Sequence, residues 1–208
     1  KLIMDVFKAI LSRHSCRNFD GRTVEPEKID KILEAARWAP SPANSQPWEF
    51  IVVTDKSAIN RLYEHSKEAK KSGVIELRGF SYIRPLPEKV KVEEKPATRY
   101  SLKFLKDVPV VIGVVGIPAP TIKQGIVERT QDSYKYACAA AIQNMLLAAE
   151  DQGLGSLWFT MYDPALVSGS LRVDPSKHLL ALVCIGYPAG KPSPRDRIAL
   201  RQKVRWIK

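Results

Sequence analysis

Apolar residues recur along the chain at two spacings, one typical of helices and the other typical of strands. The helical spacing predicts amphipathic helices over residues 2–12, 23–38, 56–71, 132–152 and 163–171. Short runs rich in β-branched residues predict strands over residues 49–53, 108–115, 154–160 and 178–185. Trp158 and Phe159 are adjacent in one of these strands, so we expect their side chains on opposite faces of the sheet.

The predicted helix over residues 132–152 has a wide apolar face that is built mainly from alanines. Small side chains let another backbone approach closely, which favours a central helix or a helix at a subunit contact. The plainer alternative is a helix that packs in an ordinary core. Gly153 is predicted to end this helix, and Asp163 is predicted to be the N-cap of the helix that follows.

Residues 198–208 are apolar at Leu200, Val204, Trp206 and Ile207, and an apolar segment of this kind needs a cover. We therefore expect an extended C-terminal arm that packs on a second subunit, rather than a terminus that frays into solvent.

The segment over residues 39–48 reads Ala-Pro-Ser-Pro-Ala-Asn-Ser-Gln-Pro-Trp and joins a predicted helix to a predicted strand. Each proline fixes its own φ and disfavours helical geometry in the residue before it. Ser41 and Asn44 therefore stand on a stiff, non-repeating backbone whose polar groups need partners or a ligand. We interpret this segment, called the cradle below, as a seat for a flat polar molecule. The alternative is a proline-rich turn that merely connects two elements.

Two arginines, Arg13 and Arg17, bracket Ser15 just past the end of the first predicted helix. Guanidinium groups bind phosphate oxygens bidentately and a serine hydroxyl adds a donor, so this basic segment (residues 13–17) could bind one anion. The alternative is a pair of solvated arginines beside a helix end, where cations are also favourable. By itself His14 indicates a surface or backbone-contact residue, because the other histidines offer no metal-site spacing.

Residues 73–105 are interrupted by glycines and prolines and show no regular period. We interpret them as a partly ordered excursion that covers a site as a lid; a solvent loop without a role is the alternative.

The 113–116 stretch, Gly-Val-Val-Gly, is not a GxGxxG turn, so a Rossmann dinucleotide site is not indicated.

Composition narrows the class of protein. The chain has 208 residues and is 45% hydrophobic, enough for one substantial core, and we expect a single domain over 1–208. The net charge of +11 suits an anionic ligand, nucleic acid or an acidic partner, but no RNA-binding pattern of interleaved aromatic and basic residues appears, and we expect no nucleic-acid partner. Three scattered cysteines favour a reducing cytoplasm over a disulfide framework or a metal site. We find neither a secretory signal nor an apolar run long enough for a membrane span.

Three blocks of this sequence together resemble the nitroreductase family of FMN-dependent flavoproteins. The 12–19 block, Ser-Arg-His-Ser-Cys-Arg-Asn-Phe, is similar to the start of that family, and the 35–48 block, Ala-Ala-Arg-Trp followed by the cradle, is similar to its Ala-Pro-Ser-x-x-Asn-x-Gln-Pro-Trp motif. In the C-terminal half, Gly-Leu-Gly-Ser over 153–156 and Gly-Tyr-Pro over 186–188 also resemble the family. The blocks agree in order and spacing over nearly the whole chain outside 73–105.

The resemblance implies an α+β fold with a central mixed sheet flanked by helices, in an intertwined homodimer with FMN at the interface. It also implies that NADH or NADPH reduces the flavin by hydride transfer, after which a nitroaromatic, quinone or related small-molecule acceptor takes the electrons. The flavin supplies this chemistry, so no side chain is assigned as catalytic.

The resemblance gives roles to particular residues. Arg13, Arg195 and Arg197 would hold the FMN phosphate, and Ser15 would donate to the phosphate or the ribityl chain. Arg17 would lie near the N1/O2 edge of the flavin ring, where a fixed cation stabilises the reduced anion.

The other expected cofactor contacts come from the basic segment, the cradle and one strand end. They are His14 in the basic segment, Pro40, Ser41 and Asn44 from the partner subunit's cradle, and Phe159 and Thr160 near the ring edge.

Two further functions stay open on the sequence. The same fold and flavin could carry out reductive dehalogenation or breakdown of the flavin itself. A protein of another class, a basic non-catalytic binder of nucleic acid or of an acidic partner, would instead be colourless, and its binding would weaken steeply with salt.

Overall fold

The computed structural model describes residues 5–71, 102–118, 132–191 and 196–207, with the backbone alone over 68–71. The expected lid over 73–105 lies outside the described residues except at its end. The elements in chain order are α1 (Val6–Ser12), α2 (Pro26–Arg37), the 3₁₀ turn η1 (Pro42–Asn44), β1 (Trp48–Val53), α3 (Lys56–Lys71), α4 (Phe104–Asp107), β2 (Val110–Gly116), α5 (Ser133–Asp151), β3 (Gly155–Phe159), α6 (Pro164–Ser170), β4 (His178–Gly186) and the 3₁₀ turn η4 (Leu200–Gln202).

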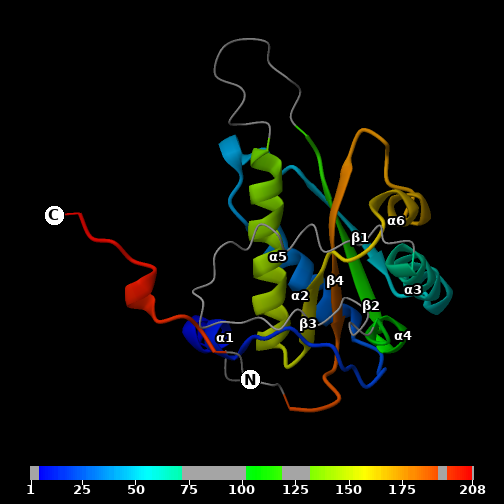
Figure 1. The fold of residues 1–208 in the computed structure, drawn as a ribbon, viewed down its shortest axis with the longest axis horizontal. Coiled ribbons are helices and arrows are strands. Elements are labelled where there is room, and N and C mark those ends of the chain that lie inside the picture. Colours follow the sequence, from blue (N-terminus) through cyan, green and yellow to red (C-terminus); the bar gives the residue numbers. More distant parts are fainter. Residues whose placement is uncertain (1–4, 72–101, 119–131, 192–195, 208) are drawn as a thin grey trace, which may run out of the picture.

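A four-stranded sheet in the order β1-β2-β4-β3 forms the centre of the fold. Helices α2 and α5 cover one face, and α3, α4 and α6 cover the other (Figure 1). Both central strands are almost wholly buried, which explains why their sequences are continuous apolar runs rather than alternating patterns. The architecture is α+β, as expected.

The expectation of a mixed sheet is wrong for the four described strands, because all three of their pairings are antiparallel. β2 begins opposite the end of β1, and β4 begins just beyond the end of β3, so each of them runs back along its neighbour. The parallel pairing that does occur among the described residues is a single bridge, between Ser15 and Ser156.

Prolines explain two element boundaries that differ from the prediction. Helix α2 begins at Pro26 rather than at residue 23, because the residue before a proline is disfavoured in helical geometry and Glu25 is extended (φ −63°, ψ 135°). Strand β2 begins at Val110 because Pro109 has no N–H to donate to the ladder. The short helix α4 was not predicted from the sequence.

Helix α5 packs in the hydrophobic core, which is the plainer of the alternatives that its alanine face left open. It packs on α2 and on the sheet, and Ala141 and Ala149 are buried in that contact. Gly153 has φ +71°, a left-handed conformation that suits glycine just after a helix. The predicted N-cap of α6 is also confirmed, since the carboxylate of Asp163 accepts from the main-chain N–H groups of Ala165 and Leu166.

Apolar side chains remain exposed on α1 and on the C-terminal arm (residues 196–207). On α1 they are Val6, Phe7, Ile10 and Leu11; on the arm they include Leu200, Trp206 and Ile207. Figure 1 shows the arm extending away from the body of the chain. No described helix has both the length and the hydrophobicity of a membrane span.

Candidate functional site

The basic segment is held against the edge strand β3. It leaves α1 in extended geometry, and the main-chain N–H of Cys16 donates to the carbonyl oxygen of Ser156 (2.8 Å). This approach requires glycine at position 155, because a Cβ there would lie 2.6 Å from the sulfur of Cys16. The basic segment and β3 can therefore lie side by side only because Gly155 has no side chain.

The extended geometry sorts the side chains of the basic segment into two sets. Cys16 is buried, while Ser15 and Arg17 are exposed and Arg13 is partly exposed. Because side chains alternate along an extended chain, we expect Arg13, Ser15 and Arg17 on one side. His14 contacts the backbone, as expected, with its Nδ1 hydrogen-bonded to the carbonyl oxygen of Ser12 (3.1 Å).

The far end of this segment is anchored to the turn after β4. The N–H of Ala189 donates to the carbonyl oxygen of Asn18 (2.9 Å), and the N–H of Asp20 donates to that of Tyr187 (3.0 Å). Arg17 thus extends from a stretch of backbone that is fixed on both sides, at Cys16 and at Asn18. Such a backbone presents a guanidinium group from a defined position.

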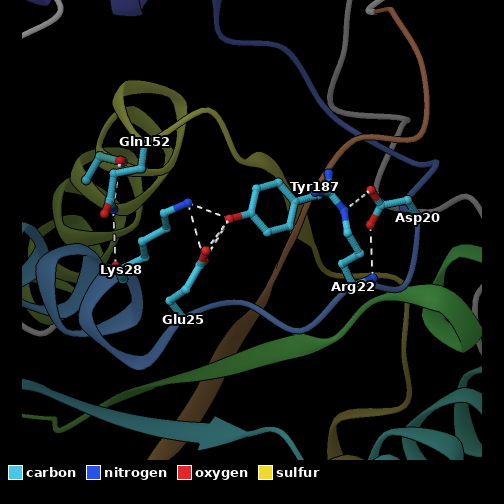
Figure 2. A network of polar contacts seen from close by, with 7 residues as sticks. Asp20, Arg22, Glu25, Lys28, Gln152 and Tyr187 are labelled. Carbon is cyan, nitrogen blue, oxygen red and sulfur yellow. Dashed lines mark hydrogen bonds and ion pairs between the residues drawn. The ribbon is translucent and has the colours of Figure 1, made fainter. Parts of the chain in front are cut away.

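A polar network around Tyr187 ties this turn to the start of α2 (Figure 2). The Tyr187 hydroxyl donates to the Glu25 carboxylate (2.7 and 2.9 Å) and accepts from Lys28 Nζ (2.5 Å), while the Arg22 guanidinium lies over the ring at 4.1 Å. The Tyr187 hydrogen bond, more than the neighbouring Lys28, lowers the pKa of Glu25 from its ordinary 4.5 to about 2. The same tyrosine is the main cause of the raised pKa of Lys28.

The network continues into the end of α5. Gln152 Nε2 donates to the carbonyl oxygen of Lys28 (3.1 Å), and the buried Gln152 Oε1 has no hydrogen-bond partner among the described residues. Sequence reasoning missed this network, because Tyr187 and Glu25 are far apart in the chain and no local pattern links them.

The cradle has a non-repeating backbone, as its prolines predicted, and that backbone is also strained. Three of its residues other than glycine have positive φ: Ala43 (49°), Asn44 (55°) and Gln46 (46°). Left-handed backbone at residues other than glycine costs of the order of 1–3 kcal/mol each and concentrates at functional sites.

Hydrogen bonds within and around the cradle hold this geometry. Ser41 Oγ accepts from the N–H of Gln46 (3.0 Å), and the carbonyl oxygen of Pro47 accepts from the N–H of Ile117 (3.0 Å) and from the thiol of Cys138 (3.5 Å). Pro40 and Asn44 are exposed and Ser41 is partly exposed, so the loop presents polar groups to solvent from a fixed frame.

Two predicted flavin contacts at the end of β3, Phe159 and Thr160, differ in exposure. The Phe159 ring is 3% exposed and packs edge-on against Phe104 in the core, at 5.3 Å between ring centroids, so only its main chain is available to a ligand. Thr160 is exposed. Trp158 is 40% exposed, which confirms that Trp158 and Phe159 lie on opposite faces.

The C-terminal arginines expected at the phosphate are only partly described. Arg197 is exposed on the C-terminal arm, and Arg195 lies outside the described residues.

One chain does not bring the cradle and the basic segment together. The cradle leads into Trp48, which pairs with Gly116 at the end of the sheet where β4 begins. The basic segment pairs with Ser156, near the end where β4 finishes at Gly186. At about 3.4 Å per residue along a strand, the two ends are roughly 25 Å apart.

The basic segment fits a phosphorylated flavin by the chemistry of its donors. Two guanidinium groups and a hydroxyl are expected on one side of a clamped backbone, a set that suits phosphate oxygens and an anionic ring edge. Among the described residues, no group of three His, Cys, Asp or Glu side chains could hold a metal ion. The structure therefore defines the class as an α+β protein with a candidate anion site along the edge of its sheet.

Comparison with known proteins identifies the family. The model of the nitroreductase family matches residues 10–187. A Methanothermobacter thermautotrophicus protein, provisionally named NADH dehydrogenase/NAD(P)H nitroreductase, is 30% identical over 197 residues, which cover 93% of this chain and 82% of that protein. The 5,6-dimethylbenzimidazole synthase of Rhodospirillum rubrum is 28% identical over 179 residues, covering 85% and 78% of the two chains.

Solved structures agree with this family at the level of the fold. A nitroreductase from Desulfovibrio desulfuricans, determined in complex with FMN, has a TM-score of 0.70 at 24% identity and covers 99% of this chain and 98% of its own. The chain belongs to the nitroreductase family, and it is an enzyme of that family.

Proposed function

We propose that this enzyme is an FMN-dependent NAD(P)H oxidoreductase that reduces nitroaromatic, quinone or related small-molecule acceptors in two steps. The observation that carries the proposal is the basic segment, whose backbone is clamped at Cys16 and Asn18. Alternation along an extended chain would then place Arg13, Ser15 and Arg17 on one side of it. The names of the relatives support the nicotinamide donor, and the FMN complex of the Desulfovibrio protein supports the cofactor.

When bound, FMN supplies the hydride chemistry, and the residues of this chain position the flavin and hold charge beside it. Arg13, together with Arg195 and Arg197 of the C-terminal region, binds the phosphate, and Ser15 adds a donor. Arg17 keeps a positive charge at the edge of the ring where negative charge accumulates on reduction. The main chain at Phe159 and the exposed Thr160 border the opposite edge. No side chain is required as an acid or base for the hydride.

The separation of the cradle from the basic segment supports a site shared by two subunits of a homodimer. A cradle that lies roughly 25 Å from its own basic segment can border a flavin on the segment of a second copy. Pro40, Ser41 and Asn44 then come from the partner. The exposed apolar side chains of α1 and of the arm support the same association, because apolar surface of this kind gains free energy when a partner covers it.

Purified protein tests the proposal directly. We expect a yellow preparation with the spectrum of oxidised flavin, a mass of two chains, and oxidation of NADH or NADPH that depends on a nitroaromatic or quinone acceptor. Protein that takes up no FMN even in excess would refute the cofactor. A flavin-loaded protein that reduces neither class of acceptor would support FMN as the cofactor but refute the proposed reaction. A colourless protein whose binding to nucleic acid falls steeply with salt would indicate the non-catalytic function instead.

The second candidate is breakdown of the flavin. The product named for the Rhodospirillum rubrum relative, 5,6-dimethylbenzimidazole, contains a dimethylated benzene ring of the kind that the isoalloxazine also carries. This function predicts that the bound flavin is consumed when the holoenzyme receives a nicotinamide donor in air, so that its absorption does not return after the donor is exhausted. A reductase instead regains the full absorption of oxidised flavin.

A further inference from the structure

Trp158 is a large apolar side chain that remains 40% exposed on an edge strand. The surroundings of Trp38 and Trp48 differ: the indole N–H of Trp38 donates to Glu34 (2.7 Å), and Trp48 stacks on Phe50. Within the described ranges, Trp158 has neither a hydrogen bond nor a ring partner. Its exposed indole face is therefore available to another molecule.

The position of Trp158 along β3 indicates which molecule that is. Because side chains alternate along a strand, Ser156, Trp158 and Thr160 follow one another on the same side of the edge. Ser156 carries the basic segment through its carbonyl oxygen, and Trp158 lies two residues further on, at about 7 Å. The edge thus presents the basic segment, then an aromatic surface, then an exposed hydroxyl. A flavin mononucleotide has a matching order, with phosphate at one end and a flat aromatic ring at the other.

We infer that Trp158 packs against the isoalloxazine ring of the bound FMN and is a positioning residue of the enzyme. The inference rests on the proposed function, since it takes FMN as the ligand of the basic segment. Aromatic rings prefer offset stacking or edge-to-face contact, and such a contact adds to the free energy of binding beyond the area that it buries. The indole also covers one side of the ring from water and fixes the plane in which the ring lies, while the arginines fix its charged end.

The test uses the holoenzyme with Trp158→Leu, which removes the aromatic face, and Trp158→Phe, which keeps a smaller one. An indole in contact with a flavin quenches its fluorescence, so we expect a longer flavin fluorescence lifetime in Trp158→Leu and an intermediate one in Trp158→Phe. We also expect the dissociation constant of FMN to rise by about 2- to 10-fold in Trp158→Leu, the effect of losing one aromatic pair. Tyr63→Phe is the control, because Tyr63 is an aromatic residue of α3, outside the cradle, the basic segment and β3, and this variant should keep the wild-type lifetime and affinity.

The outcomes separate this inference from the proposed function. Wild-type protein that takes up no FMN would refute both. Flavin that binds to wild type and to Trp158→Leu with the same affinity and the same lifetime would refute the role of Trp158 alone. Trp158→Leu could instead lose the dimer, measured as mass by light scattering, while the flavin lifetime in the remaining dimer stays unchanged. That result would assign the exposed indole to the subunit contact and would also refute the role of Trp158 at the flavin. The thermal midpoint of each apo variant shows whether it folds, and Trp158→Phe carries the test if Trp158→Leu does not fold.

Discussion

A methyl group added at Gly155 should displace the basic segment without touching any of its charged side chains. In Gly155→Ala the new Cβ would lie 2.6 Å from Cys16 Sγ and 2.8 Å from Cys16 Cβ, closer than such atoms are found in proteins. Since Cys16 is buried and its N–H is bonded to Ser156, the segment cannot move away without losing that hydrogen bond.

The size of the effect follows from this geometry. Overpacking a well-filled interior costs about 1–3 kcal/mol of unfolding free energy. We expect a loss in that range for apo Gly155→Ala, measured by urea titration. We also expect the dissociation constant of FMN to rise about tenfold, which corresponds to about 1.4 kcal/mol, measured by flavin titration.

Gly169→Ala is the matched control, because Gly169 lies in helix α6 and a Cβ there meets nothing within 4 Å. In a helix this change stabilises by roughly 0.5–1 kcal/mol and should leave FMN affinity unchanged. Cys16→Ala in the Gly155→Ala background removes one of the two close contacts and should recover part of the stability, so the double change should cost less than the sum of the single changes. Wild-type stability and affinity in Gly155→Ala would refute the account of how β3 positions the basic segment.

Three further changes test the other parts of the site. Tyr187→Phe removes the hydroxyl that holds the pKa of Glu25 near 2. A carboxylate with a lowered pKa stabilises the fold above its ordinary pKa of 4.5 and loses that contribution as the pH falls toward 2, so the free energy of unfolding should decline less steeply between pH 4.5 and 2 in the variant. An unchanged slope would show that the hydrogen bond does not set this pKa. The double change Arg13→Ala with Arg197→Ala should release FMN during gel filtration while the far-ultraviolet circular dichroism stays that of wild type; a variant that retains stoichiometric flavin would contradict the phosphate assignment. Removal of residues 198–208 takes away the exposed apolar side chains of the arm and should shift the mass toward one chain at micromolar concentration, whereas a dimer as stable as wild type would place the subunit contact elsewhere.

Local patterns predicted much of the fold because local physics fixes it. Helix α3 has the predicted limits and α5 differs from them by one residue at each end, since apolar spacing and a terminal glycine define α5 within its own sequence. The N-cap of α6 follows from Asp163 alone. The starts of α2 and β2 were displaced because a proline removes a conformation before α2 and a hydrogen-bond donor before β2.

Long-range contacts explain what the sequence could not predict. The prolines indicated a stiff cradle, but the left-handed backbone at Ala43 and Gln46 depends on tertiary contacts, including those of Pro47 with Ile117 and Cys138. The pairing of Cys16 with Ser156 joins distant parts of the chain in the same way. Of the candidate contacts on β3, the sequence identified Phe159 and Thr160 by resemblance, but whether a side chain faces the core or solvent was settled only by packing.

The placement of the cradle and the basic segment at opposite ends of the sheet has a thermodynamic consequence. If a flavin needs the segment of one copy and the cradle of another, then loading with cofactor and association of the chains form one linked equilibrium. Dilution would release FMN, excess FMN would drive the chains together, and a lone chain would hold the coenzyme only by its phosphate end.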